Sequence, residues 1–139
     1  MRLVLDSNEY IFAFGSAQKP VCALLINTIL SVHPEHSLRI PRLITEEVSR
    51  HLTLKACKEF MGFINNLTAI DEDFVVPFEL GAQYEARGLK PADAFIAAYV
   101  EWTGAEVFVS ENRHFLRRTS SLPFHILNAD NCIKLLKGK

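Results

Sequence analysis

The sequence predicts an α/β protein in which helices cover both faces of a parallel sheet. First, β-type runs of three or four residues alternate with helical segments, which is typical of βαβ units. Second, runs such as Leu3-Val4-Leu5 are apolar throughout, as expected of strands buried on both faces. Third, the 139 residues are 49% hydrophobic and 22% charged, which suits a folded domain with a sizeable core. The chain contains no repeat, linker or low-complexity segment, so we expect a single domain over residues 1–139.

In the first half of the chain, proline and glycine mark where the helices begin and end. Pro20 and Pro41 suit the first turn of a helix, whereas Gly15 and His33-Pro34 suit the end of one. The elements expected here are a strand over residues 3–5, helices over 10–14 and 20–32, a strand over 38–40, and helices over 41–54 and 57–67.

The second half continues the same alternation. One helix closes at Gly104, since glycine commonly follows the last turn of a helix. The elements expected here are a strand over residues 74–76, helices over 78–86 and 91–103, a strand over 107–109, a helical turn over 113–117, a strand over 124–127 and a helix over 129–136.

Charge and cysteine content exclude several classes of protein. Fifteen Lys and Arg against sixteen Asp and Glu exclude nucleic-acid binding through bulk positive charge, although a local basic patch stays open. The three cysteines show no C-x-x-C spacing, which excludes a disulfide framework and a four-cysteine zinc site, and we expect free thiols. No segment has the apolar length of a membrane span and the N-terminus is unlike a signal peptide, so we expect a cytoplasmic protein.

Polar clusters follow three of the expected strands, at residues 6–8, 110–112 and 128–130. Ligands of open parallel sheets bind beyond the carboxyl ends of the strands, so these clusters place a candidate site. Asp6 follows the first strand directly, and it suits either a metal ligand or the cap of the next helix.

The two glutamates of the helix over residues 41–54 differ in direction. At about 100° per residue, Glu47 falls within the apolar stripe of that helix, whereas Glu46 falls outside it. A carboxylate on the apolar side costs free energy unless it is paired, hydrogen-bonded or bound to a metal. The alternative is that Glu47 lies at the edge of the stripe and reaches water.

Asp93 and the 110–112 cluster add further oxygen ligands. Asp93 lies in the first turn of a helix, where the helix dipole favours an acid, but the helix is apolar nearly all round, so we expect Asp93 to face a cleft. Glu111 and Asn112 suit either metal binding or capping of the next turn. The chain has no glycine-rich phosphate loop, no G-x-S-x-G and no H-x-x-x-H, and the remaining oxygen ligands suit Mg²⁺ or Mn²⁺.

Four segments together resemble the PIN-domain family of metal-dependent ribonucleases, which includes the VapC-type toxins of toxin–antitoxin pairs. They are LVLDSN at 3–8, PRLITEEV at 41–48, KPADAFIAA at 90–98 and FVSENRHF at 108–115. The resemblance implies a three-layer α/β/α sandwich around a five-stranded parallel sheet of order 3-2-1-4-5. It implies an acidic pocket in which Asp6, Glu47, Asp93 and Asn112 are catalytic and hold one or two Mg²⁺ or Mn²⁺ ions. The family usually has an aspartate where this chain has Asn112, which removes one charge.

This interpretation assigns supporting roles to further residues. We expect Ser7, Asn8, Ser110 and Glu111 to orient the ligands. We expect RNA phosphates to contact Arg113, His114, Arg117 and Arg118, with Arg39, Arg42 and Arg50 near the second acidic segment. The expected partners are RNA, an antitoxin protein and a second copy in a homodimer.

One other function stays open, a catalytically silent PIN-like module that binds RNA or a protein, and Asn112 supports it. A doubly wound phosphatase or response regulator does not fit, because Asn8 stands where the second acid of such a site is expected and no strand-end Lys is suitably placed.

Overall fold

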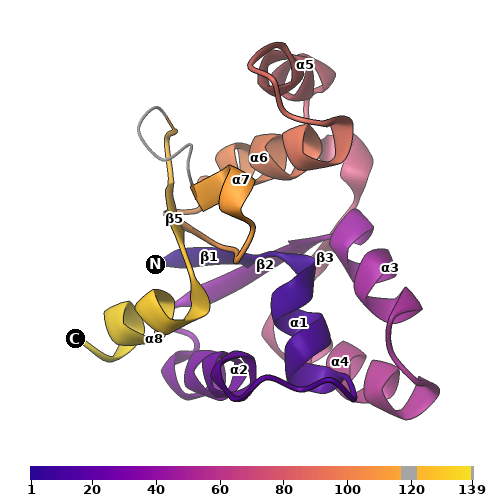
Figure 1. The fold of residues 1–139 in the computed structure, drawn as a ribbon, viewed down its shortest axis with the longest axis vertical. Helices are drawn as coiled ribbons and strands as arrows, with labels where there is room; N and C mark the ends of the chain where they lie inside the picture. Colours follow the sequence, from indigo (N-terminus) through magenta and orange to yellow (C-terminus); the bar gives the residue numbers. More distant parts are fainter. Residues whose placement is uncertain (117–121, 139) are drawn as a thin grey trace.

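A computed structural model describes residues 1–116 and 122–138 of the chain. Most elements match the predicted order and length (Figure 1). In chain order they are β1 (Arg2–Leu5), α1 (Ser7–Phe14), α2 (Pro20–Val32), β2 (Ser37–Pro41), α3 (Arg42–Arg50), α4 (Leu54–Leu67), β3 (Ile70–Asp71), the 3₁₀ helix η1 (Asp73–Val75), α5 (Phe78–Ala86), α6 (Pro91–Thr103), β4 (Val107–Val109), α7 (Arg113–Leu116), β5 (His125–Leu127) and α8 (Ala129–Lys137).

The five strands form a parallel sheet of order β3-β2-β1-β4-β5, which confirms the predicted order. The central strand β1 pairs on both sides, with Leu3 opposite Leu38 in β2 and opposite Val107 in β4. Its residues Leu3, Val4 and Leu5 are completely buried, because both faces of the sheet are covered.

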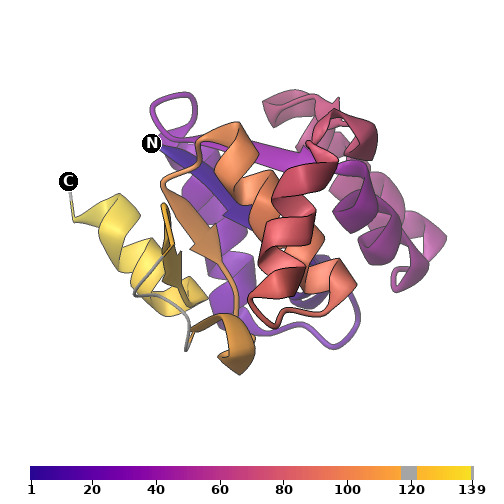
Figure 2. The same ribbon diagram turned by 90° about the horizontal axis from the view of Figure 1, so that it is seen from above.

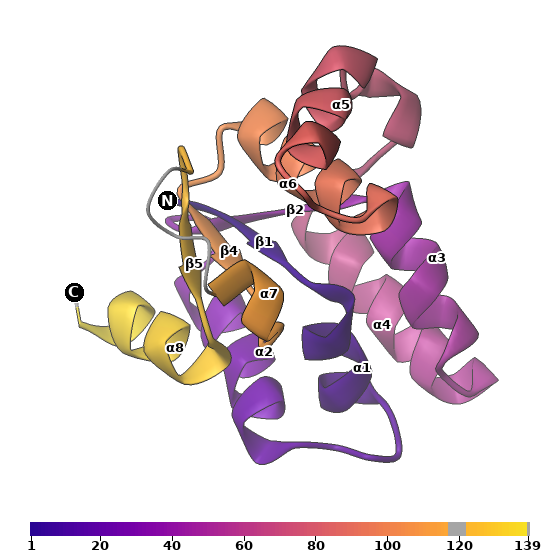
Figure 3. The same ribbon diagram turned by 45° about the horizontal axis from the view of Figure 1, so that its top comes forward.

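The helices complete three layers. Helix α2 packs against both α1 and α8 below the sheet in the view of Figure 1, while α6 covers the other face. Helix α5 packs on α6 at the outside of the molecule, as the view from above shows (Figure 2). Helix α3, which follows β2, contacts α1, which follows β1. The ends of β1 and β2 therefore lie at the same edge of the sheet (Figure 3).

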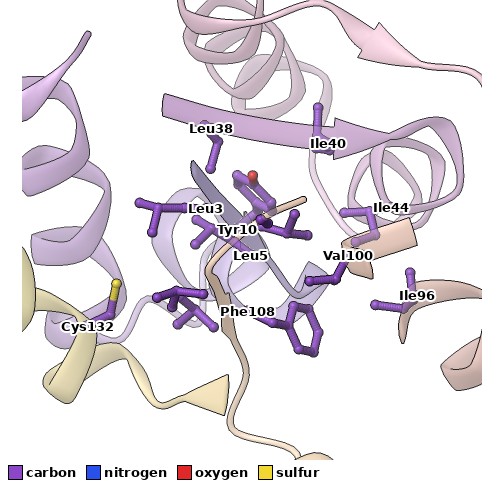
Figure 4. Close-up of a cluster of buried hydrophobic side chains, with 14 of the residues drawn as sticks. Leu3, Leu5, Tyr10, Leu38, Ile40, Ile44, Ile96, Val100, Phe108 and Cys132 are labelled. Carbon is purple, nitrogen blue, oxygen red and sulfur yellow. The ribbon is translucent and has the colours of Figure 1, made fainter. Parts of the chain in front are cut away.

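The core lies on both faces of β1 and β4. Side chains from β1, β2, α1, α3, α6, β4 and α8 converge there (Figure 4). Aromatic rings pack edge-on between neighbouring elements. The ring centroids of Phe108 in β4 and Phe115 are 5.1 Å apart, and those of Tyr10 in α1 and Phe60 in α4 are 5.2 Å apart.

The prediction of a strand over residues 74–76 is wrong. The third strand is Ile70–Asp71, which pairs with Ile40 and Pro41, and the chain then turns into η1. The Asp71 carboxylate accepts two hydrogen bonds from Arg39 and one from the Tyr99 hydroxyl, which anchors β3 at this position. Phe74 is 85% exposed, so the apolar run does not mark a buried strand.

Helix boundaries also differ between residues 50 and 57. Helix α3 ends at Arg50 and α4 begins at Leu54, three residues before the predicted start. The reason is a cap: the Thr53 hydroxyl accepts a hydrogen bond from the Ala56 N–H at 3.2 Å, which satisfies a free donor of the first turn.

Asn128, in the polar cluster after β5, has a structural role as the N-cap of α8. Its side-chain oxygen accepts a hydrogen bond from the Asn131 N–H at 2.8 Å. We expect Asn128→Ala to lower the free energy of unfolding by about 1 kcal/mol, because the first turn of α8 loses this acceptor. Asn128→Asp keeps an acceptor and should retain nearly all of that stability, as urea denaturation would measure. Equal losses in both variants would contradict the capping role.

The cysteines are free thiols, with Cys22 and Cys132 buried and Cys57 half-buried. Across residues 1–116 and 122–138, no helix combines the length and apolar character that a membrane span requires.

Candidate active site

Asp6 stands where the central strand β1 ends and α1 begins. Its Oδ1 accepts a hydrogen bond from the Ser7 N–H at 2.9 Å, so Asp6 caps α1, one of the two roles that its position allows. Its Oδ2 accepts a second hydrogen bond from the Ser110 hydroxyl at 2.8 Å. The backbone N–H of Asp6 donates to the Val109 carbonyl at 2.8 Å, which joins the ends of β1 and β4.

Ser110 connects Asp6 with Asn112, residues from opposite ends of the sequence. The Ser110 side chain is fully buried, and its hydroxyl donates to Asp6 while it accepts the Asn112 N–H at 3.0 Å. Asn112 is half-buried, and its carbonyl accepts the Phe115 N–H at the start of α7. A single hydroxyl therefore orients the carboxylate of β1 and the loop after β4.

Glu47 and Asp93 come to the same edge of the sheet from α3 and α6. Helix α3 follows β2, and α6 precedes β4, so the first turn of α6 with Asp93 lies at the carboxyl ends of the strands. Glu47 and Asp93 are half-buried, whereas Glu46 is exposed, as the helical periodicity predicts. The alternative for Glu47, an edge position that reaches water, therefore fits its partial exposure, and its charge still acts on the site.

The pKa of Asp6 responds to the other two acids at this edge of the sheet. The pKa of Asp6 is raised, first by burial and then by the negative charges of Glu47 and Asp93, while hydrogen bonds from Ser110 and Ser7 act in the opposite direction. Three carboxylates that repel one another at one edge make a favourable environment for a cation.

The donor set fits a divalent ion in its chemistry, since carboxylate and amide oxygens are the ligands of Mg²⁺ and Mn²⁺. Within the described part of the chain, however, no three side chains of His, Cys, Asp or Glu close around one point tightly enough to hold a metal. Asp6, Glu47 and Asp93 are thus close enough to interact through their charges, but they do not form a closed ligand cage.

The residues expected to orient the ligands fall into two groups. Ser7 and Ser110 are buried beside Asp6, whereas Asn8 is exposed. Glu111 is exposed, but its Oε2 accepts the Ala129 N–H at 2.9 Å, so it ties the loop after β4 to the start of α8.

The sequence interpretation missed Glu9, which is completely buried on α1. The Cys22 thiol donates to its Oε1 at 3.5 Å, while within residues 1–116 and 122–138 no partner satisfies its Oε2. Burial first, and then contact with the Glu111 carboxyl, raise the pKa of Glu9 from 4.5 to about 8, which favours the protonated acid. Glu9 lies one helical turn before Ala13 on the buried face of α1, but the expected helix over residues 10–14 left it out.

The predicted basic cluster is described only in part. Arg113 is exposed at the start of α7, directly after Asn112. Nothing is described for the side chain of His114, and Arg117 and Arg118 lie outside the described residues. Near the second acidic segment, Arg39 pairs with Asp71 at 2.9 Å and Arg42 with Glu72 at 2.6 Å, so both are engaged within the protein.

Comparison with models of known families and with curated proteins finds no match. Among solved structures, the chain is similar to a crystal structure of VapBC2 from Rickettsia felis bound to a DNA fragment from their promoter. The similarity has a TM-score of 0.62 at 15% sequence identity, and it covers 92% of this chain and 98% of the other. The fold is PIN-like.

The PIN-like fold accounts for how the site is arranged. Its order of strands brings β1 and β4 together as neighbours, so the carboxyl ends carrying Asp6 and Ser110 lie side by side. This is the edge at which parallel α/β sheets bind their ligands.

Proposed function

We propose that this protein is a metal-dependent endoribonuclease that hydrolyses phosphodiester bonds of RNA. The observation that carries the proposal is the set of three acids at the carboxyl edge of the sheet: Asp6, half-buried at the end of the central strand, and Glu47 and Asp93, near enough for their charges to act on it. Hydrolysis of RNA by way of a divalent cation needs such a group of negative oxygen ligands at an accessible edge.

Asp6, Glu47 and Asp93 would hold Mg²⁺ or Mn²⁺, and Asn112 would add a neutral oxygen or orient a water molecule. The cation, when bound, lowers the pKa of a water and neutralises charge on the phosphate. Ser110 would keep the Asp6 carboxylate in one orientation through the 2.8 Å hydrogen bond. The exposed Arg113 guanidinium beside Asn112 would contact a backbone phosphate of the RNA.

A ribonuclease that is toxic to its own cell needs an inhibitor, and the similar structure is a VapBC2 assembly bound to promoter DNA. We therefore include in the proposal that this chain is the toxin of a toxin–antitoxin pair. An antitoxin arginine paired with the acidic edge would compete with the cation there.

A second candidate is a catalytically silent module that binds RNA or a protein. Asn112 favours it, because an amide removes one negative charge from the set, and so does the open arrangement of the three carboxylates described above. The two candidates differ in what a divalent cation does.

The test is cleavage of a panel of structured and single-stranded RNAs by the purified protein in Mg²⁺, in Mn²⁺ and in EDTA. We expect cleavage with either cation and none in EDTA, because the carboxylates alone cannot activate water. Mn²⁺ binding by calorimetry on the same preparation separates a silent module from an enzyme offered the wrong RNA. A folded protein that neither binds Mn²⁺ nor cleaves any RNA would contradict the nuclease, and Asn112→Asp would then be the variant to assay.

A further inference from the structure

A hollow of about 530 Å³ lies between η1, α5 and α6, on the outer layer of the molecule. We call it the α5–α6 hollow, and its lining includes Phe74, Phe78, Phe95, Pro91, Asp73 and Glu85. Phe74 and Phe78 are 85% and 87% exposed, more than the other large apolar side chains exposed in the described residues. Two phenyl rings held in water beside a concave surface are typical of a binding surface.

The two charged side chains that line the hollow, Asp73 and Glu85, are acids, and no Lys or Arg is among its lining residues. Asp71 and Glu72 are neutralised by Arg39 and Arg42, but among the described residues neither Glu79 nor Glu85 forms a salt bridge. The nearest cations in the sequence, Arg87 and Lys90, follow α5, and Arg87 lies over the Tyr84 ring at 5.3 Å.

Three kinds of molecule could bind this combination of apolar rings and negative charge: single-stranded RNA, a second copy of the chain, or a segment of another protein. Single-stranded RNA stacks on exposed aromatic rings, but its phosphates would approach Asp73, Glu79 and Glu85, and like charges repel. A second copy related by a two-fold axis would bring the same acidic surface against itself. A protein segment with bulky apolar side chains flanked by Lys or Arg matches both the rings and the charge.

We propose that the α5–α6 hollow is a docking site for a cationic, amphipathic segment of a partner protein, with apolar side chains of that segment seated on Phe74 and Phe78. Pro91 and Phe95 line the hollow from one face of α6, whereas Asp93, about 200° round the helix from Pro91, points away from that face. The proposal stands independently of RNA cleavage, because it concerns a surface that the hydrolysis does not use.

The experiment is selection of a displayed library of random 16-residue peptides on the full-length protein, followed by fluorescence anisotropy of the enriched peptides. We expect the enriched peptides to carry bulky apolar residues and a net positive charge. Their affinity should fall at least about tenfold for Phe74→Ser/Phe78→Ser and for Glu79→Lys/Glu85→Lys. These side chains are exposed, and circular dichroism checks that the variants fold.

The matched control is Leu54→Ser/Glu59→Lys, which makes the same kinds of change on the exposed side of α4 and should leave peptide affinity unchanged. Failure to enrich peptides, or enriched peptides that bind the hollow variants as tightly as the wild type, would overturn the proposal. The proposal would also be overturned if Phe74→Ser/Phe78→Ser lowered the affinity for a single-stranded RNA but left the affinity for the peptides unchanged. Conversion of a dimer to a monomer by that variant, measured by sedimentation, would assign the hollow to a second copy instead.

Discussion

Asp6→Asn is expected to reduce metal-dependent RNA cleavage by at least about 100-fold, since each 1.36 kcal/mol of lost transition-state stabilisation costs a factor of ten and a bound cation supplies several kcal/mol. Asparagine keeps the size of the side chain and its Oδ1 can still accept the Ser7 N–H, so α1 remains capped. What is lost is the negative charge at the end of β1. Cleavage rate and Mn²⁺ affinity, measured on the same protein, should both fall.

The neighbouring glutamates of α3 provide a matched control for the loss of charge. Glu47→Gln should weaken Mn²⁺ binding and cleavage, whereas Glu46→Gln, which changes an exposed side chain one residue away, should leave both near the wild-type level. If Asp6→Asn and Glu47→Gln cleave as well as Glu46→Gln does, the acidic edge is not the catalytic site.

Glu9→Gln is expected to stabilise the protein at pH 8 and to have little effect at pH 4.5. The folded state raises the pKa of Glu9 from 4.5 to about 8, so folding holds a proton that the unfolded chain releases at lower pH. The stability of the wild type therefore decreases as pH rises from about 4.5 to about 8, by several kcal/mol for a shift of this size. Glutamine resembles the protonated acid and removes this contribution.

Urea denaturation of wild type and Glu9→Gln at half-unit pH steps measures the effect as a difference. The pKa of Asp6 is also raised, so Asp6 changes the pH dependence of the free energy of unfolding in the same direction in both proteins. This contribution cancels in the difference between them. Glu59→Gln, an exposed glutamate on α4, is the control and should follow the wild type. A wild type and Glu9→Gln that differ by the same amount at every pH would contradict a protonated Glu9.

Much of the fold could be predicted because its signals are local. The helix over Pro20–Val32 has proline at its start and His33-Pro34 at its end, and both bounds are those predicted. Helix α6 ends where Gly104 adopts a φ of 72°, as its glycine indicates. The strand over residues 74–76 failed because an apolar run indicates burial only when another layer covers it, and nothing in the sequence states that Phe74 remains outside.

Those residues of the candidate site could be predicted whose position depends on a single strand or helix. Asp6 follows a strand, and the helical period separates Glu47 from Glu46. Ser110 could be placed near the site but not joined to Asp6, since that hydrogen bond spans 104 residues. Glu9 was missed because its environment is assembled from Cys22 on α2 and Glu111 after β4.

The sequence by itself determined the class of fold and the identity of the acids at the strand ends, because short-range periodicity and end signals encode both. The tertiary structure alone decided which hydroxyl holds Asp6, that Glu9 keeps its proton, and that Phe74 and Phe78 face water. Each of these depends on groups that folding brings together from distant positions, and burial and charge act through space rather than along the chain.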